Sequence, residues 1–125
     1  PITREKQMIQ ATDSSKTVDE DFYTFEKRFV ADSVFQMSRI IFSDLGYKGD
    51  DDPESPAVKL SPENWTLFKT TFSDVRKMGQ YKTDMKLTSD KCEQAIWIES
   101  SSFMLKYTYT KIRGKWYLTK SFERY

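Results

Sequence analysis

The chain has 125 residues, 38% hydrophobic and 15% aromatic, and its 20 Lys and Arg against 19 Asp and Glu leave a net charge of +1. This length fits one domain, and so small a net charge argues against a nucleic-acid-binding surface, which needs a basic excess on one face. Because the sequence has no His and a single Cys, it excludes a Ser-His-Asp triad, a Cys-His dyad, His-ligated zinc and an internal disulfide.

Residues 1–17 are polar and show no hydrophobic periodicity, so we expect a flexible lead-in there. The chain opens on Pro1 rather than Met, which we interpret as a mature or trimmed form. No run is long and apolar enough to span a bilayer. The remaining residues, 18–125, are expected to form one domain.

The first predicted helix begins near Val18 and carries a stripe of aromatic residues. Phe22, Phe25 and Phe29 are three and four positions apart, which is the spacing of one face of an amphipathic helix. The three acids at 19–21 would then lie in the first turn, where they favour the helix dipole. This face is expected to pack on a sheet.

The stretch DSVFQMSRIIF follows and is open to two interpretations. Asp32 can cap a short helix over 33–38, and the β-branched run at 39–42 predicts a strand. In one interpretation the stretch is a structural corner in which Gln36 and Arg39 hold backbone carbonyls. In the other, the same two side chains point inward and bind a polar ligand.

An acidic loop occupies residues 46–56, where glycines and prolines accompany four acids. The stretch GDDDPES at 49–55 raises the possibility of calcium binding. Calcium loops of the EF-hand type need acids at alternate positions, a central Gly and a final Glu, whereas these acids are consecutive. We therefore predict a solvated loop and no metal site.

A second long helix is predicted from Ser61 to Gly79. Ser61 would be its N-cap, Pro62 its first residue and Gly79 its stop. Its apolar residues recur at helical spacing: Trp65, Phe68, Phe72 and Val75.

The last third predicts antiparallel strands at 81–87 and 93–100 and a hairpin over 103–123 that turns at Arg113-Gly114. A two-residue turn sets the register, and one face becomes aromatic. The expected pairs are Lys111–Trp116, Tyr109–Leu118, Tyr107–Lys120, Leu105–Phe122 and Phe103–Arg124. The expected aromatic face holds Phe103, Leu105, Tyr107, Tyr109, Trp116, Leu118 and Phe122.

Helices followed by a meander predict an α+β fold, with N-terminal helices packed on a curved antiparallel sheet. This order resembles the nuclear transport factor 2-like fold, a cone in which the sheet wraps the first helix. The stretch DFYTFEKRFVADSVFQMSRIIF also resembles the opening of a family of bacterial domains of unknown function. The positions that carry this resemblance are Phe25, Phe29, Asp32, Phe35, Gln36 and Arg39, followed by Trp65 and the aromatic hairpin.

The resemblance implies an exported, envelope-associated protein of a gut-type bacterium, with the character of a lipoprotein whose anchor is removed. It implies no established reaction and no cofactor. One departure is that RIIFSDLG lacks the Pro expected soon after the strand. Residues that repeat with a fold usually serve the fold, so we favour the corner interpretation of Gln36 and Arg39.

If the protein has a ligand pocket, we expect it at the open end of the cone, between the aromatic sheet face and the short helix over 33–38, with Arg39, Tyr109 and Trp116 as its residues. Tyr109 and Trp116 would supply apolar walls with a polar handle. Arg39 is the cation beside the helix-to-strand corner, and its planar guanidinium suits a carboxylate or a phosphate. The alternative is that Arg39 is buried and satisfied by carbonyls or by an acid such as Asp32.

Three functional hypotheses remain open at this stage. The first is a non-catalytic binding or interaction module of an exported cell-envelope protein, whose partner is a small molecule or an envelope protein. The second is an isomerase- or lyase-type enzyme that uses an inward carboxylate and a Tyr. The third is a structural domain that forms a homodimer through the outer sheet face, where Met104, Ile112 and Tyr117 would lie.

Catalysis would require a carboxylate against an apolar wall with a raised pKa. The nominal bases are Asp32, Asp84 and Glu99, and the sequence does not show which acid points inward, so no catalytic residue is assigned. Without a His to act as its base, Cys92 is expected to be a small buried apolar side chain.

Overall fold

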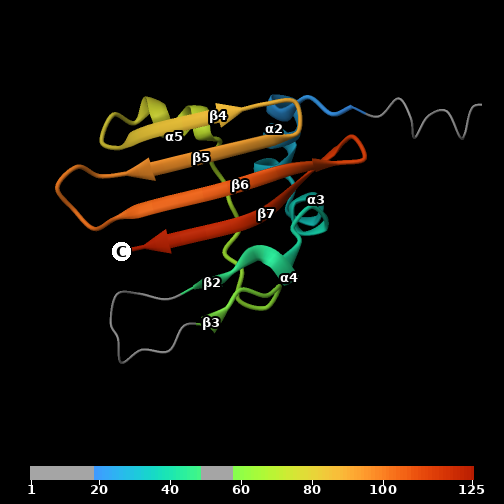
Figure 1. Cartoon of the computed structure of the whole chain (residues 1–125), viewed down its shortest axis with the longest axis horizontal. Coiled ribbons are helices and arrows are strands. Elements are labelled where there is room, and N and C mark those ends of the chain that lie inside the picture. The colour runs from blue at the N-terminus through green and yellow to red at the C-terminus, as the bar shows by residue number, and fades with distance from the viewer. Residues whose placement is uncertain (1–18, 49–57) are drawn as a thin grey trace, which may run out of the picture.

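The computed structural model describes residues 19–48 and 58–125. The expected lead-in at 1–17 and the acidic stretch at 49–55 lie outside the described residues. A four-stranded antiparallel sheet of order β4-β5-β6-β7 forms one layer, and helices lie against one of its faces (Figure 1). The α+β class predicted from the sequence is confirmed.

Helix α2 (Phe22–Ala31) confirms the predicted aromatic stripe. Phe22, Phe25 and Phe29 are all buried. The helix begins one turn later than expected, because the Asp21 carboxylate is the N-cap and accepts a hydrogen bond from Thr24 N at 3.0 Å. Glu20 therefore lies outside the helix and is free for another role.

Helix α3 (Ser33–Ser38) is capped as predicted, since Asp32 Oδ1 accepts a hydrogen bond from Phe35 N at 3.0 Å. The strand predicted at 39–42 is wrong. Ile40 forms one isolated parallel bridge with Leu118, and helix α4 (Phe42–Leu45) follows at once. The residues of this run are apolar because the chain is buried where it meets the edge of β7 at one point. Helix α4 follows and places Leu45 in the core.

The helix predicted from Ser61 to Gly79 is also wrong over its first half. Residues 62–64 form a turn, in which Ser61 N donates to the Asn64 side chain at 2.9 Å, and residues 65–69 have no regular secondary structure. Helix α5 (Phe72–Lys77) begins only after Thr71, whose hydroxyl accepts from Asp74 N at 3.2 Å. Gly79 has φ +79° just beyond this helix and confirms the expected stop.

The main sheet consists of β4 (Lys82–Leu87), β5 (Lys91–Trp97), β6 (Met104–Ile112) and β7 (Lys115–Arg124). The predicted strands and the two-residue turn are confirmed. Arg113 and Gly114 have φ of 53° and 80°, as a type I′ hairpin turn requires. A small ribbon, β2 (Tyr47–Lys48) with β3 (Val58–Lys59), lies beyond β7 (Figure 1).

The hairpin register is correct near the turn and shifted by one residue beyond it. Lys111 pairs with Trp116 and Tyr109 with Leu118, as expected. An irregularity between Thr108 and Tyr109 then shifts the pairing, as a β-bulge does when one strand holds an extra residue. The observed pairs further along are Tyr107–Ser121, Leu105–Glu123 and Met104–Arg124.

Those pairs correct the Tyr107–Lys120, Leu105–Phe122 and Phe103–Arg124 expectations. The shift also changes the aromatic face, because Ser121 turns inward with 8% exposure and Phe122 turns outward with 45% exposure. The rest of the core forms where α2 meets the sheet. The Phe22 ring lies 5.1 Å from the Trp116 ring and 5.2 Å from the Tyr109 ring. Within the part of the chain described, no helix is long and apolar enough to cross a membrane.

Candidate functional site

Arg39, the polar group of the expected pocket, is held by Glu20 and by β7. Its Nη1 and Nη2 donate to the two carboxylate oxygens of Glu20 at 2.6 and 2.9 Å, and Nη1 also donates to Trp116 O at 3.1 Å. The guanidinium carbon lies 4.5 Å from the centre of the Phe35 ring. Arg39 thus joins the entry of α2, the helix α3 and the edge of the sheet.

Glu20 completes this junction. It accepts a hydrogen bond from Trp116 N at 2.8 Å, and its own carbonyl accepts one from Trp116 Nε1 at 2.9 Å. Burial raises the pKa of the Glu20 carboxyl, but the hydrogen bonds from Arg39 and Trp116 N outweigh burial and hold that pKa below its ordinary value. Glu20 and Arg39 therefore form an ion pair in which each charge is neutralised by the other.

Tyr109 and Trp116 are almost fully buried, with 1% and 2% exposure. The rings of α2 fill the space above them, since Phe22 contacts both and Phe29 lies 5.8 Å from Tyr109. The structure brings Arg39 and Trp116 together as a packed junction, while Tyr109 lies further along the sheet. Ligand contact by these three residues stays a prediction.

Gln36 behaves as the corner interpretation predicts, and it uses both ends of its amide. Its Nε2 donates to Phe29 O at 2.6 Å and to Phe68 O at 2.9 Å. Its Oε1 accepts from Trp65 Nε1 at 3.0 Å and from Phe68 N at 2.8 Å. This Gln36 cluster (Phe29, Gln36, Trp65 and Phe68) ties the irregular segment 65–71 to α2 and α3.

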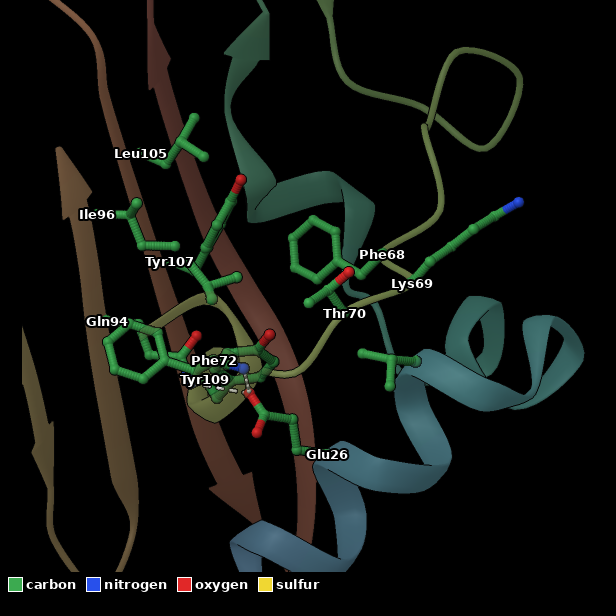
Figure 2. A pocket seen from close by; sticks show the side chains of 12 residues that line it. Glu26, Phe68, Lys69, Thr70, Phe72, Gln94, Ile96, Leu105, Tyr107 and Tyr109 are labelled. Carbon is green, nitrogen blue, oxygen red and sulfur yellow. Dashed lines mark hydrogen bonds between the residues drawn. The ribbon is translucent and has the colours of Figure 1, made fainter. Parts of the chain in front are cut away.

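A cavity of about 170 Å³ lies between α2, the end of segment 65–71 and the inner face of β5 and β6. We call it the Glu26 cleft. Figure 2 shows that the labelled side chains other than Lys69 gather around it from these elements. Its walls are mostly aromatic and aliphatic, with Glu26, Lys69, Thr70 and Gln94 as polar or charged groups. The main lining residues are Glu26, Phe68, Phe72, Gln94, Leu105, Tyr107 and Tyr109.

Glu26 lies on the buried side of α2, with 5% exposure. Both of its hydrogen bonds end on the same oxygen: Oε2 accepts from Gln94 Nε2 at 3.0 Å and from Phe72 N at 3.3 Å. Oε1 accepts no hydrogen bond from a described residue. Among the described residues, one half of the carboxylate is therefore fixed by hydrogen bonds and the other half is not.

The pKa of Glu26 is raised. Burial disfavours its charged form and is the largest cause, the hydrogen bonds from Gln94 and Phe72 lower the pKa by less, and the nearby Asp74 raises it further. This is the carboxylate against an apolar wall that the catalytic hypothesis required and left unassigned. The three nominal bases differ from it, because Asp32 caps α3 while Asp84 and Glu99 are exposed.

The sequence held a signal for Glu26 that the aromatic stripe concealed. Glu26 follows Phe22 by four positions and precedes Phe29 by three, so helical spacing places it on the same buried face. An acid on a buried face needs partners or a function. No such spacing marks Gln94. This residue lies on β5 and meets Glu26 only because α2 packs on the sheet.

Cys92 is fully buried, and burial raises its pKa to about 12, with the neighbouring Glu26 charge adding to the shift. It is therefore a neutral thiol and packs as an apolar side chain, as expected. On the other sheet face, Ile112 is exposed, whereas Met104 and Tyr117 are half-buried. Across residues 19–48 and 58–125, no group of three or more acids, His or Cys could hold a metal ion.

Comparison with known proteins gives a family and a fold. One protein-family model matches residues 20–125 of this chain. A search of curated proteins finds no match. The NMR structure of a protein from Bacteroides uniformis ATCC 8492 is similar, with a TM-score of 0.59 and 24% identity over 83% of this chain and 76% of that chain. This likeness concerns the fold alone.

Proposed function

The chain belongs to the family whose model matches residues 20–125, and we propose that it is a non-catalytic module that binds a small, largely apolar molecule in the Glu26 cleft. The observation that carries this proposal is the half-satisfied Glu26 carboxylate in a cavity with aromatic walls. Ligand sites combine apolar walls, which supply area, with a few fixed polar groups, which orient the ligand.

The size of the cleft supports a compact ligand. Its volume is about 170 Å³, and an engineered protein cavity of about 150 Å³ binds benzene. The cleft therefore suits one ring or a branched aliphatic group together with a short polar substituent. A dissociation constant on the order of 1 mM, about 4 kcal/mol, is reasonable for so small a probe.

Two further parts of the proposal concern setting. The fold is proposed to be a nuclear transport factor 2-like cone, which the order of helices before a meander and the packing of α2 on one sheet face support. The protein is proposed to act at the cell envelope after export. That part rests on the sequence resemblance, and fractionation of cells expressing the complete gene would test it.

Binding can be tested with benzyl alcohol, followed by NMR amide shifts. We expect shifts at cleft residues in the wild type and their loss in Leu105→Trp, because a larger ring at this half-buried position fills the cleft. Ile112→Trp is the matched control on the same strand, at an exposed position. Absence of shifts in the wild type at millimolar probe, or unchanged binding by Leu105→Trp, would overturn the proposal.

A second candidate is an enzyme in which Glu26 removes a proton from carbon next to a carbonyl group. The raised pKa of Glu26 favours it, since a general base works best when its pKa lies near the working pH. Deuterium exchange into the α-carbon positions of phenylacetone in D₂O tests this role. Faster exchange with the wild type than with Glu26→Gln would support it, and equal rates would exclude it for this substrate class.

A further inference from the structure

We infer that the Glu26 cleft selects a primary ammonium group carried on a benzene-sized apolar body, with the ammonium at Glu26 Oε1. This inference rests on the proposed binding function and adds the chemical class of the ligand. It follows from three features of the cleft: how Glu26 is held, how the charge around it is balanced, and what the walls are made of.

The carboxylate is held for use by a ligand. Gln94 Nε2 and Phe72 N both donate to Oε2, which fixes the orientation of the group from β5 and from the start of α5 (Figure 2). Oε1 then presents its acceptor sites to something that donates. An ammonium offers three donors and no acceptor, so it matches an acceptor-only oxygen without leaving a lone pair of its own unpaired.

Among the described residues that line the cleft, no cation lies beside the charge of Glu26. Lys69 is the one Lys or Arg in that lining, and its exposed side chain extends away from Glu26 (Figure 2). Asp74 lies close enough to repel the charged form of Glu26, so it adds a second negative charge to this region. A buried carboxylate is stable when it is paired, so a bound cation would offset the desolvation of Glu26, whereas an anion would be repelled.

The walls suit the same ligand. Phe68, Phe72, Tyr107 and Tyr109 present rings to the cavity. Ring faces attract cations as well as apolar groups, and this attraction strengthens where water is excluded. The apolar body would lie among the rings, and the ammonium would meet Glu26 at the α2 side.

The test compares three probes that share one ring: benzylamine, benzyl alcohol and benzoate. At about pH 8 the amine is protonated, as its aliphatic ammonium resembles that of Lys. In the wild type we expect benzylamine to bind at least tenfold more tightly than benzyl alcohol, about 1.4 kcal/mol, and benzoate more weakly than either. In Glu26→Gln the alcohol should still bind and the preference for the amine should disappear.

Asp74→Asn is the matched control, because it removes an exposed carboxylate near the cleft and should keep the preference. Equal binding of amine and alcohol by the wild type would overturn the inference and leave the binding function intact. A preference that survives Glu26→Gln would also overturn it. If none of the three probes binds the wild type, the binding function and this inference both fail.

If Glu26→Gln does not fold, the pH dependence of binding by a variant that keeps Glu26 decides the question. Among the described residues, the titratable groups that interact with Glu26 are Asp74 on α5, Cys92 on β5 and Tyr109 on β6. Burial raises the pKa of the Cys92 thiol and the Tyr109 hydroxyl, so neither ionises at acidic pH. In the Asp74→Asn background, benzylamine binding should weaken as the pH falls through the Glu26 pKa, while benzyl alcohol binding should not. Parallel loss of both would contradict the inference.

Discussion

Two buried polar side chains of the N-terminal helices, Gln36 and Glu26, hold the same stretch of chain and differ in how completely they are used. Gln36 binds both backbone groups of Phe68, with its donor and its acceptor both engaged. Glu26 binds Phe72 N with one oxygen only. Both residues are at most 5% exposed.

This difference helps to distinguish a buried polar side chain that stabilises the fold from one that could bind a ligand. A buried polar group whose hydrogen bonds are all made within the chain stabilises the fold and leaves nothing for a ligand. A buried group that is fixed on one side and open on the other is ready for a ligand, and the fold bears the desolvation of its charge. The predictions below test this distinction, beginning with the largest expected effect.

Replacing Gln36 should destabilise the protein most. Gln36→Met keeps the volume but leaves four groups of the Gln36 cluster without their partner, each worth about 1 kcal/mol. We expect the free energy of unfolding, measured with urea, to fall by about 3–5 kcal/mol. Gln80→Met, at an exposed position, is the control and should change it little. A loss below about 1 kcal/mol would show that the tie is not structural.

Breaking the Arg39–Glu20 junction should have the next largest effect. Arg39→Met removes three charge-assisted hydrogen bonds at a site where Arg39 keeps only 12% side-chain exposure. The expected loss is about 2–3 kcal/mol. Arg28→Met is the control, because its ion pair with Asp32 spans 3.9 Å on the surface, and it should lose less than about 1 kcal/mol. Similar losses of stability in Arg39→Met and Arg28→Met would mean that the Arg39–Glu20 junction contributes no more to stability than a surface ion pair.

The two glutamates should give opposite pH dependence. The pKa of Glu20 is lowered by folding, so its contribution is present above its ordinary pKa of 4.5 and disappears as the pH falls through the lowered value. The pKa of Glu26 is raised by folding, so stability present below 4.5 is lost as the pH rises through the raised value.

Urea unfolding between about pH 3 and pH 8 measures both slopes. Relative to Glu20→Gln, the wild type should gain stability with rising pH. Relative to Glu26→Gln, the wild type should lose stability as the pH rises. If both comparisons have the same sign, the two carboxylates do not differ in environment as described.

Ser121 extends the comparison to a buried hydroxyl with no partner at all. Its Oγ is buried and unpartnered among the described residues. Ser121→Ala removes a desolvated polar atom and no hydrogen bond, so it should leave stability unchanged or raise it by up to about 1 kcal/mol. Thermal unfolding measures this small effect, and a clear loss would point to a missing partner.

The local features of the fold could be read from the sequence. The aromatic stripe of α2, the Asp32 cap and the Arg113-Gly114 turn each depend on residues within a few positions of one another. The hairpin register was correct only up to the bulge next to Tyr109, since nothing local marks where a strand gains an extra residue.

The candidate site was much harder to predict. Arg39, Tyr109 and Trp116 have the chemistry of a binding site, but the packing of Phe22 and the charge of Glu20 engage them. Glu26 was overlooked, although its spacing on α2 placed it inside. Whether an inward polar residue is satisfied depends on partners that the chain brings from 46 and 68 positions away.

The sequence by itself determined the α+β class, the first two helices and the strands of the main sheet, because periodicity and capping act between neighbours along the chain. Only the tertiary structure decided that segment 65–71 is not helical and that Glu26 lines a cleft. Gln36 takes the backbone N–H and C=O of Phe68 for itself, so these groups are unavailable to the helix that the local spacing favours. Hydrogen bonds between distant residues thus override local preference, and the same long-range contacts create the cleft.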